Sequence, residues 1–278
     1  MIEILKAALL GLIEGITEWL PISSTGHLIL ADEFIQLGAS DAFKEMFEVV
    51  IQLGAILAVV VLFWAKLWPF CLRREEHGFL ARYCKKDVWS MWFHVLVAIL
   101  PAMVIGLPLD DWMTEHLHTP LVVAAMLILY GVIFIVMETV YKNHTFPIRR
   151  IGRITYPIAF GIGMFQVLSL VPGTSRSGAT IIGAMLLGCS RTVAAEFTFF
   201  LAIPVMFGAS LVKMLKFGFA FSGLELGMLA VGMLVAFVVS VLSIRFLMNY
   251  VKKHDFKLFG WYRIVLGILV LAYFYVIK

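Results

Sequence analysis

Residues 14–27 read Glu-Gly-Ile-Thr-Glu-Trp-Leu-Pro-Ile-Ser-Ser-Thr-Gly-His and set two carboxylates, several hydroxyls and an imidazole into an otherwise apolar sequence. Glu14 and Glu18 are four residues apart, so they share one face of a helix. Pro21 and the Ser-Ser-Thr-Gly run then break that helix and expose backbone N–H groups and hydroxyls. Ionisable groups and irregular backbone are costly inside a membrane unless they line a polar site. The stretch therefore predicts a functional site.

The composition of the whole chain explains why the membrane is the expected surrounding. Of 278 residues, 62% are hydrophobic and only 14% are charged, and the mean hydropathy is +0.98. So few charged residues would leave the surface of a soluble domain of this length largely apolar. We therefore expect an all-α polytopic membrane protein in contact with membrane lipids. The net charge of +4 gives no reason to expect a nucleic-acid partner. The N-terminal segment lacks a cleavage site and is expected to be retained. The cysteines are scattered and suggest neither disulfides nor a zinc site: Cys71, Cys84 and Cys189.

The first half of the chain contains two short apolar stretches, on either side of the break, and three longer ones. Because a membrane span needs about 20 residues, the short pair is predicted to form a re-entrant hairpin, 2–37, that returns to the side it came from. The three longer segments, each long enough to cross, are 46–66, 88–109 and 120–141.

The pattern then starts again. A second predicted hairpin, 155–189, contains the break Val171-Pro-Gly-Thr-Ser-Arg-Ser-Gly178, and spans follow at 193–216, 224–249 and 258–277. In the alignment of the two halves, Leu20–Ser24 pairs with Val171–Ser175. The chain is thus predicted to be one membrane domain of two repeats, about 1–141 and 155–278. Three spans per repeat make this an inverted-topology repeat, whose two polar tips meet near the midplane.

Charges in the connecting segments set the expected orientation. By the positive-inside rule the basic loops lie in the cytoplasm, so both termini and the site face the outer side. The acidic connection around Asp110, Asp111 and Glu115 agrees with an outer location. The basic residues are Lys66, Arg73, Arg74, Arg82, Lys85 and Lys86, then Lys142, Arg149, Arg150 and Arg153, and finally Lys252, Lys253 and Lys257.

The second break has the composition of a phosphate-binding loop. It offers glycines for close backbone approach, hydroxyl donors and one arginine ahead of a helix: Gly173, Thr174, Ser175, Arg176 and Ser177. Helix N-termini favour anions, and a guanidinium matches phosphate oxygens. The alternative is an ordinary helix cap whose arginine only neutralises Glu14 or Glu18.

In the first break, two ionised glutamates would repel each other in a low dielectric. They are tolerable if they share Mg²⁺ or Ca²⁺, share a proton, or face Arg176. The hydroxyl of Ser24 or Thr25 could attack phosphorus, with His27 as general base and later acid.

The two breaks resemble those of the undecaprenyl-diphosphate phosphatase family of bacterial inner membranes, also called the bacitracin-resistance family. The resemblance spans essentially the full length and rests on Glu14–Glu18, Leu20–His27, Phe47–Ala55, Pro172–Thr180 and Ala194–Pro204. It implies hydrolysis of a C55 polyprenyl diphosphate to the monophosphate and inorganic phosphate, which recycles a lipid carrier for cell-wall synthesis. Loss or excess of the protein would then alter bacitracin sensitivity.

For the site, the resemblance implies a divalent-metal requirement and an opening toward the outer face. Glu14 and Glu18 become metal-binding or catalytic acids, Ser24 the favoured nucleophile with Thr25 beside it, and His27 the acid/base or, alternatively, the nucleophile. The phosphate ligands it implies are Ser175, Arg176 and Thr180. The type-2 phosphatidic acid phosphatases share a Ser-Thr-Gly-His run, but their further motif is unmatched.

One rival function is open at this point. Inverted repeats with broken helices are also a transporter architecture, so a carrier or flippase of an anionic lipid is the alternative. A carrier needs charge complementarity but no activated nucleophile, which makes the Ser24–His27 pair the discriminating feature. The sequence leaves open which metal binds, whether a homodimer forms, which prenyl lengths are accepted and whether lipid is also flipped.

Overall fold

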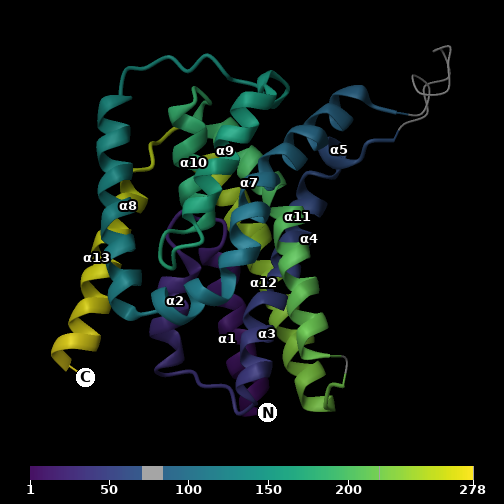
Figure 1. Ribbon diagram of the computed structural model, residues 1–278, viewed down its shortest axis with the longest axis vertical. Coiled ribbons are helices and arrows are strands. Elements are labelled where there is room, and N and C mark those ends of the chain that lie inside the picture. Colours follow the sequence, from purple (N-terminus) through teal and green to yellow (C-terminus); the bar gives the residue numbers. More distant parts are fainter. Residues whose placement is uncertain (71–83, 219, 278) are drawn as a thin grey trace.

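The computed structural model describes residues 1–70, 84–218 and 220–277, and this part of the chain is built from helices (Figure 1). Cys71, Arg73, Arg74 and Arg82 lie outside the described residues. The first half contains α1 (Ile2–Thr17), α2 (Ser24–Asp32), α3 (Asp41–Val50), α4 (Gln52–Leu62), α5 (Trp64–Leu67), α7 (Lys86–Leu117) and α8 (Pro120–Val140). The second contains η1 (Ile151–Arg153), α9 (Tyr156–Leu168), α10 (Arg176–Leu186), α11 (Arg191–Phe217), α12 (Gly223–Tyr250), α13 (Lys257–Ala272) and η2 (Tyr273–Ile277).

Six helical segments of the described residues are long and apolar enough to cross a membrane, which confirms the predicted six spans and makes this a multi-pass membrane protein. They are Asp41–Leu62, Lys86–Gly106, Pro120–Val140, Arg191–Phe217, Gly223–Tyr250 and Lys257–Val276. The predicted span 46–66 lies too far along the chain. Its helix starts at Asp41 because the Ser40 side chain caps it, accepting from the Phe43 N–H at 3.2 Å, and a turn at Ile51 divides it into α3 and α4.

The two breaks in the apolar segments share one backbone geometry. Ser23 and Ser175 both have φ of +72°, a region that non-glycine residues rarely adopt. Each caps the following helix, because its hydroxyl accepts from the backbone N–H of Gly26 or Gly178, at 3.4 and 3.2 Å. The predicted alignment paired Ser24 with Ser175 and was one residue off, since the backbone pairs Ser23 with Ser175.

Helices from the two halves of the chain pack against each other in a crossed arrangement. The first helix of the N-terminal pair, α1, lies on α12, and the first helix of the C-terminal pair, α9, lies on α7. A Cβ at Gly11 would meet the Gly232 carbonyl, and a Cβ at Gly163 would meet that of Ala98. Small residues permit such close contacts, which drive helix association in lipid. The last span, α13, runs beside α8 at one edge of the molecule (Figure 1).

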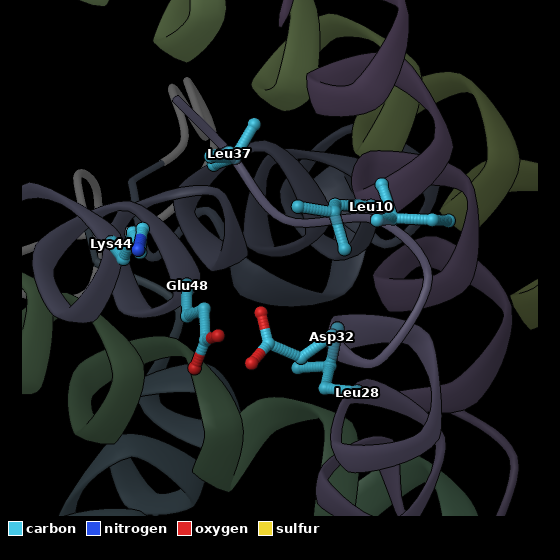
Figure 2. Close-up of a pocket in the computed structure, with 7 residues that line it drawn as sticks. Leu10, Leu28, Asp32, Leu37, Lys44 and Glu48 are labelled. Atoms are coloured by element: carbon cyan, nitrogen blue, oxygen red, sulfur yellow. The ribbon is translucent and has the colours of Figure 1, made fainter. Parts of the chain in front are cut away.

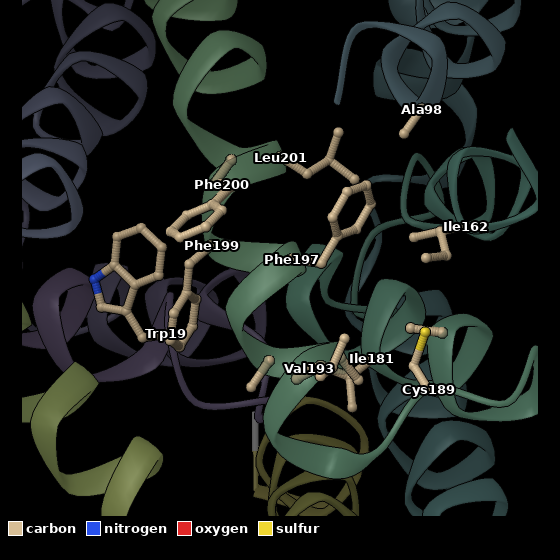
Figure 3. Close-up of a cluster of buried hydrophobic side chains, with 14 of the residues drawn as sticks. Trp19, Ala98, Ile162, Ile181, Cys189, Val193, Phe197, Phe199, Phe200 and Leu201 are labelled. Carbon is tan, nitrogen blue, oxygen red and sulfur yellow. The ribbon is translucent and has the colours of Figure 1, made fainter. Parts of the chain in front are cut away.

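An aromatic cluster fixes the first break against the core. Trp19, the residue after Glu18, is fully buried and meets the Phe199 ring of α11 edge-on, with ring centroids 5.3 Å apart (Figure 3). Phe63 in turn packs edge-on against the neighbouring Phe200, at 5.4 Å. Because close-packed aromatic rings hold few alternative positions, Trp19 fixes the end of α1 and thereby the backbone of Glu18.

Candidate active site

An ion pair joins the two breaks. The Arg176 guanidinium, at the start of α10, donates from Nη2 and Nε to Glu18 Oε1, at 2.9 and 3.2 Å. Its remaining arm, Nη1, donates to the carbonyl of Thr198 on α11, at 3.1 Å. Both side chains of the pair are largely buried. The alternative that Arg176 neutralises a glutamate of the first break is therefore present in the structure, and Glu18 is its partner.

The hydroxyl of Ser24 lies at the same carboxylate. Its Oγ donates to Glu18 Oε2 at 3.3 Å, so Glu18 contacts the arginine with one oxygen and the serine with the other. Ser24 is the first residue of α2 and is half-buried. Thr25 follows it, also half-buried, and takes no part in these hydrogen bonds. Of the two predicted nucleophiles, the structure thus brings Ser24 to the acid.

The second predicted acid, Glu14, is fully buried and its oxygens are unpaired. Neither carboxylate oxygen has a hydrogen-bond partner among the described residues. The charged groups that act on it are Glu18, Glu48 and Arg176, and the amide of Gln52 is a neutral polar neighbour. Orphaned buried oxygens beside a second carboxylate fit the oxygen ligands that Mg²⁺ or Ca²⁺ takes. Within the described ranges, no group of three or more acidic, histidine or cysteine side chains is placed to hold a metal. A cation at this site would therefore take its remaining oxygen ligands from water or from a bound phosphate.

The ring nitrogens of His27 have their partners outside this cluster. Its Nδ1 lies 2.7 Å from the Ser23 carbonyl oxygen and its Nε2 lies 2.7 Å from the Tyr262 hydroxyl of α13. The imidazole and phenol rings are nearly parallel, 11° apart, with centroids 5.6 Å apart. Both ring nitrogens are thus occupied, and neither contacts Ser24. The predicted role of His27 as the base for Ser24 is not met in this arrangement.

Most of the hydroxyls predicted to bind phosphate already have hydrogen-bond partners within the protein. Ser177 donates to the Glu18 carbonyl at 3.0 Å, and Thr180 donates to the Arg176 carbonyl at 2.8 Å. Ser175 caps α10 as described. Only Thr174 among these has a buried hydroxyl without a partner in the described part of the chain. Gly173 has φ of +91° and packs so tightly on Val123 that a side chain would collide with its backbone.

A buried arginine that the sequence analysis did not single out holds both breaks. Arg263 of α13 is fully buried and donates to the Pro21 carbonyl of the first break, at 3.3 Å. Its Nη2 also donates to the carbonyls of Gly173 and Thr174 in the second, at 2.8 and 2.9 Å. A charge inside a predicted span was the available signal, because such charges are functional by default. Tyr262 gave no signal, since tyrosines near span ends are commonly interface anchors.

A further pair of carboxylates lies next to the site. Asp32 at the end of α2 and Glu48 of α3 point toward each other across a small pocket that Lys44 also lines (Figure 2). In the sequence, Glu196 stands five residues before Leu201 as Glu48 stands five before Leu53, and the two align between the halves. Glu196 instead forms an ion pair with Lys66, with Nζ and Oε1 2.7 Å apart. Glu48 and Glu196 therefore have different partners.

The arrangement combines a guanidinium that donates twice to one carboxylate oxygen, a hydroxyl that donates to the other oxygen, and the orphaned oxygens of a second carboxylate. Fold and site together define a multi-pass membrane protein with a buried polar centre built from two helix breaks. A family model described as "Bacitracin resistance protein BacA" matches residues 7–269, and the chain belongs to that family.

Curated relatives agree over the full length. An undecaprenyl-diphosphatase of Enterococcus faecalis is 63% identical over 270 residues, which cover 97% of this chain and 96% of that protein. An undecaprenyl-diphosphatase of Desulfitobacterium hafniense is 59% identical over 275 residues, which cover 99% of this chain and 97% of that protein.

Proposed function

We propose that the protein is an undecaprenyl-diphosphatase that hydrolyses undecaprenyl diphosphate to undecaprenyl phosphate and inorganic phosphate. The observation that carries the proposal is the cluster of Arg176, Glu18 and Ser24. In it, a guanidinium and a hydroxyl nucleophile both donate to one carboxylate, which is the proton acceptor. Phosphoryl transfer depends on positioning and on charge stabilisation, and these groups supply both. The activity named for its full-length relatives is the same.

In the proposed reaction, Ser24 Oγ attacks the terminal phosphorus. Its proton passes to Glu18, which already accepts that hydrogen bond, and the P–O bond to the bridging oxygen breaks, so that undecaprenyl phosphate leaves. Water then attacks the phosphoserine, breaks its Oγ–P bond and releases inorganic phosphate, while the proton on Glu18 returns to Ser24 Oγ. Arg176 turns from Glu18 toward the phosphoryl oxygens as their charge grows. This assignment gives Glu18 the role in the first step that the sequence analysis predicted for His27. His27 then acts in the second step, where its Nε2 takes a proton from the attacking water and afterwards releases it to solvent.

We propose Glu14 and Glu18 as the residues that would hold a divalent cation. When bound, it would supply positive charge to the diphosphate oxygens. The orphaned oxygens of Glu14 support this choice, because an unpaired buried carboxylate is otherwise costly.

The proposed topology is an inverted repeat in the cytoplasmic membrane, with two re-entrant hairpins, α1–α2 and α9–α10. The equal φ of Ser23 and Ser175 and the crossed packing of α1 on α12 and α9 on α7 support it. Both termini lie at one end of the helix bundle and the link between α8 and α9 lies at the other (Figure 1). That link carries Arg149, Arg150 and Arg153, and by the positive-inside rule these charges support a proposal in which the termini and the opening of the site face the outer side.

The test is phosphate release from undecaprenyl diphosphate by the purified protein in detergent, with and without EDTA. We expect release that EDTA abolishes, that Mg²⁺ or Ca²⁺ restores, and that falls at least about 100-fold in Ser24→Ala. Ser222→Ala, which alters a helix cap far along the chain, is the matched control and should keep full activity. Full activity of Ser24→Ala would refute the assigned nucleophile.

The second candidate is translocation of an anionic lipid, which the meeting of two helix breaks at one arginine favours. If well-folded protein releases no phosphate under any metal, transfer of polyprenyl phosphate between the leaflets of vesicles becomes the assay. A carrier would depend on Arg176 but not on the Ser24 hydroxyl.

A further inference from the structure

Within the proposed function, one residue outside both breaks has contacts that suggest a role in the reaction. Tyr262 lies on α13, and its hydroxyl is 2.7 Å from Nε2 of His27 on α2. The two rings also stack, with planes 11° apart. Two independent contacts, one polar and one between ring faces, thus determine where the imidazole lies and how it is turned.

The other ring nitrogen determines how the protons are placed. Nδ1 of His27 lies 2.7 Å from the carbonyl oxygen of Ser23, and a carbonyl oxygen only accepts hydrogen bonds. Nδ1 therefore carries the proton. In the neutral ring Nε2 is then the basic atom, and it accepts from the Tyr262 hydroxyl.

The position of Tyr262 is itself fixed by its neighbour in the chain. Arg263 donates to carbonyls in both breaks, at Pro21, Gly173 and Thr174. This places α13 in one register relative to the site and with it the Tyr262 hydroxyl. The hydrogen bonds of Arg263 therefore fix the position of Tyr262, the partner of His27, relative to both breaks.

We propose that Tyr262 is a positioning residue for the reaction: its hydroxyl and its ring hold the His27 imidazole, whose tautomer the Ser23 carbonyl sets, at the edge of the site. Tyr262 itself does not contact the substrate. Without its hydroxyl the imidazole can rotate about its side-chain bonds, so a smaller fraction of molecules has the basic nitrogen in place. Because the phosphate-binding groups are untouched, kcat falls while KM stays near the wild-type value.

The experiment compares Tyr262→Phe with Tyr273→Phe, which removes another tyrosine hydroxyl of the same C-terminal segment, one that donates to Glu33. We expect kcat for phosphate release to fall about 10-fold in Tyr262→Phe, within the range of acid–base contributions, and to change little in Tyr273→Phe. In a His27→Gln background, Tyr262→Phe should have no further effect, since it acts through His27. An additive loss in that background would mean a purely structural role and would overturn the proposal.

A second measurement does not depend on turnover. Diethyl pyrocarbonate acylates unprotonated imidazole nitrogens, and mass spectrometry gives the rate of its reaction at His27. We expect this rate to rise several-fold in Tyr262→Phe, because Nε2 is then uncovered, and to stay unchanged in Tyr273→Phe. An unchanged rate would overturn the contact on which the proposal rests. If the wild-type protein released no phosphate, the proposed function would fail while this labelling result still decided the contact.

Discussion

Replacing Arg176 by alanine should lower both stability and activity, for two different reasons that can be measured separately. The guanidinium donates two hydrogen bonds to Glu18, at 2.9 and 3.2 Å, and one to the Thr198 carbonyl, at 3.1 Å. Its removal leaves Glu18, only 7% exposed, without its counter-charge and beside the buried Glu14. Breaking a buried ion pair from one side costs about 3–5 kcal/mol. For a chain of this size that lowers the unfolding midpoint by roughly 6–20 °C.

The loss of activity has a different origin and should not be recovered with stability. A cationic donor that reaches the transferring phosphoryl group in the transition state contributes about 10²–10³-fold to kcat. Adding Glu18→Gln to Arg176→Ala removes the uncompensated charge, so the double variant should regain most of the lost stability. It should remain inactive, because it lacks both the cation and the proton acceptor.

Thermal unfolding in detergent and phosphate release, measured on the same preparations, test both statements. Arg150→Ala is the matched control, since Arg150 is exposed in the link between the two halves. If Arg176→Ala keeps kcat within threefold of the wild type, the assignment of the site is refuted. If the double variant is no more stable than the single one, the ion-pair argument is refuted instead.

Three other substitutions separate the contributions of neighbouring groups. Arg263→Leu removes the donor of five hydrogen bonds to backbone carbonyls, so unfolding midpoint and phosphate release should fall together; full activity would show that the breaks keep their places without it. Gly54→Ala puts a Cβ against the Met233 carbonyl and should lower the unfolding midpoint by several degrees, whereas Gly208→Ala, with open space around it, should not. Glu14→Gln keeps the shape of the buried side chain and can still pair with the neighbouring Gln52 amide; it should leave the midpoint nearly unchanged and raise the metal concentration for half-maximal activity about 10-fold or more, and an unchanged metal requirement would remove Glu14 from the proposed ligands.

Local sequence patterns were sufficient to predict the spans and the two breaks. Long apolar runs must become helices in lipid because each backbone group needs an internal partner, and Pro21 and Pro172 interrupt such runs. The pairing of Arg176 with a glutamate of the first break was among the predicted alternatives, because a guanidinium and two carboxylates in an apolar interior each need compensation. The exact start of the span at Asp41 did not follow, since it depends on the Ser40 cap.

The contacts of His27 could not be predicted from its neighbours in the sequence. Its place three residues after Ser24 suggested a serine–histidine pair, but the ring turns to Tyr262, a residue more than two hundred positions away. Which face of α13 meets α2 depends on how α13 packs on α8, and the period of an almost uniformly apolar helix carries no such information. The same limitation hid Arg263, whose partners are backbone carbonyls that no side-chain pattern identifies.

The structure makes each break dependent on the other for its polar groups. The Glu18 carbonyl of the first break accepts from Ser177 of the second, and the Glu18 carboxylate accepts from Arg176. Arg263 then satisfies carbonyls on both sides, at Pro21 and at Gly173. In an apolar surrounding neither break would be tolerated alone, because each would leave carbonyls and a charge unpaired. The proposed catalytic cluster therefore forms only when the two halves of the chain are packed together. The hydrogen bonds that satisfy the broken helices are the same ones that hold Ser24, Glu18 and Arg176 together.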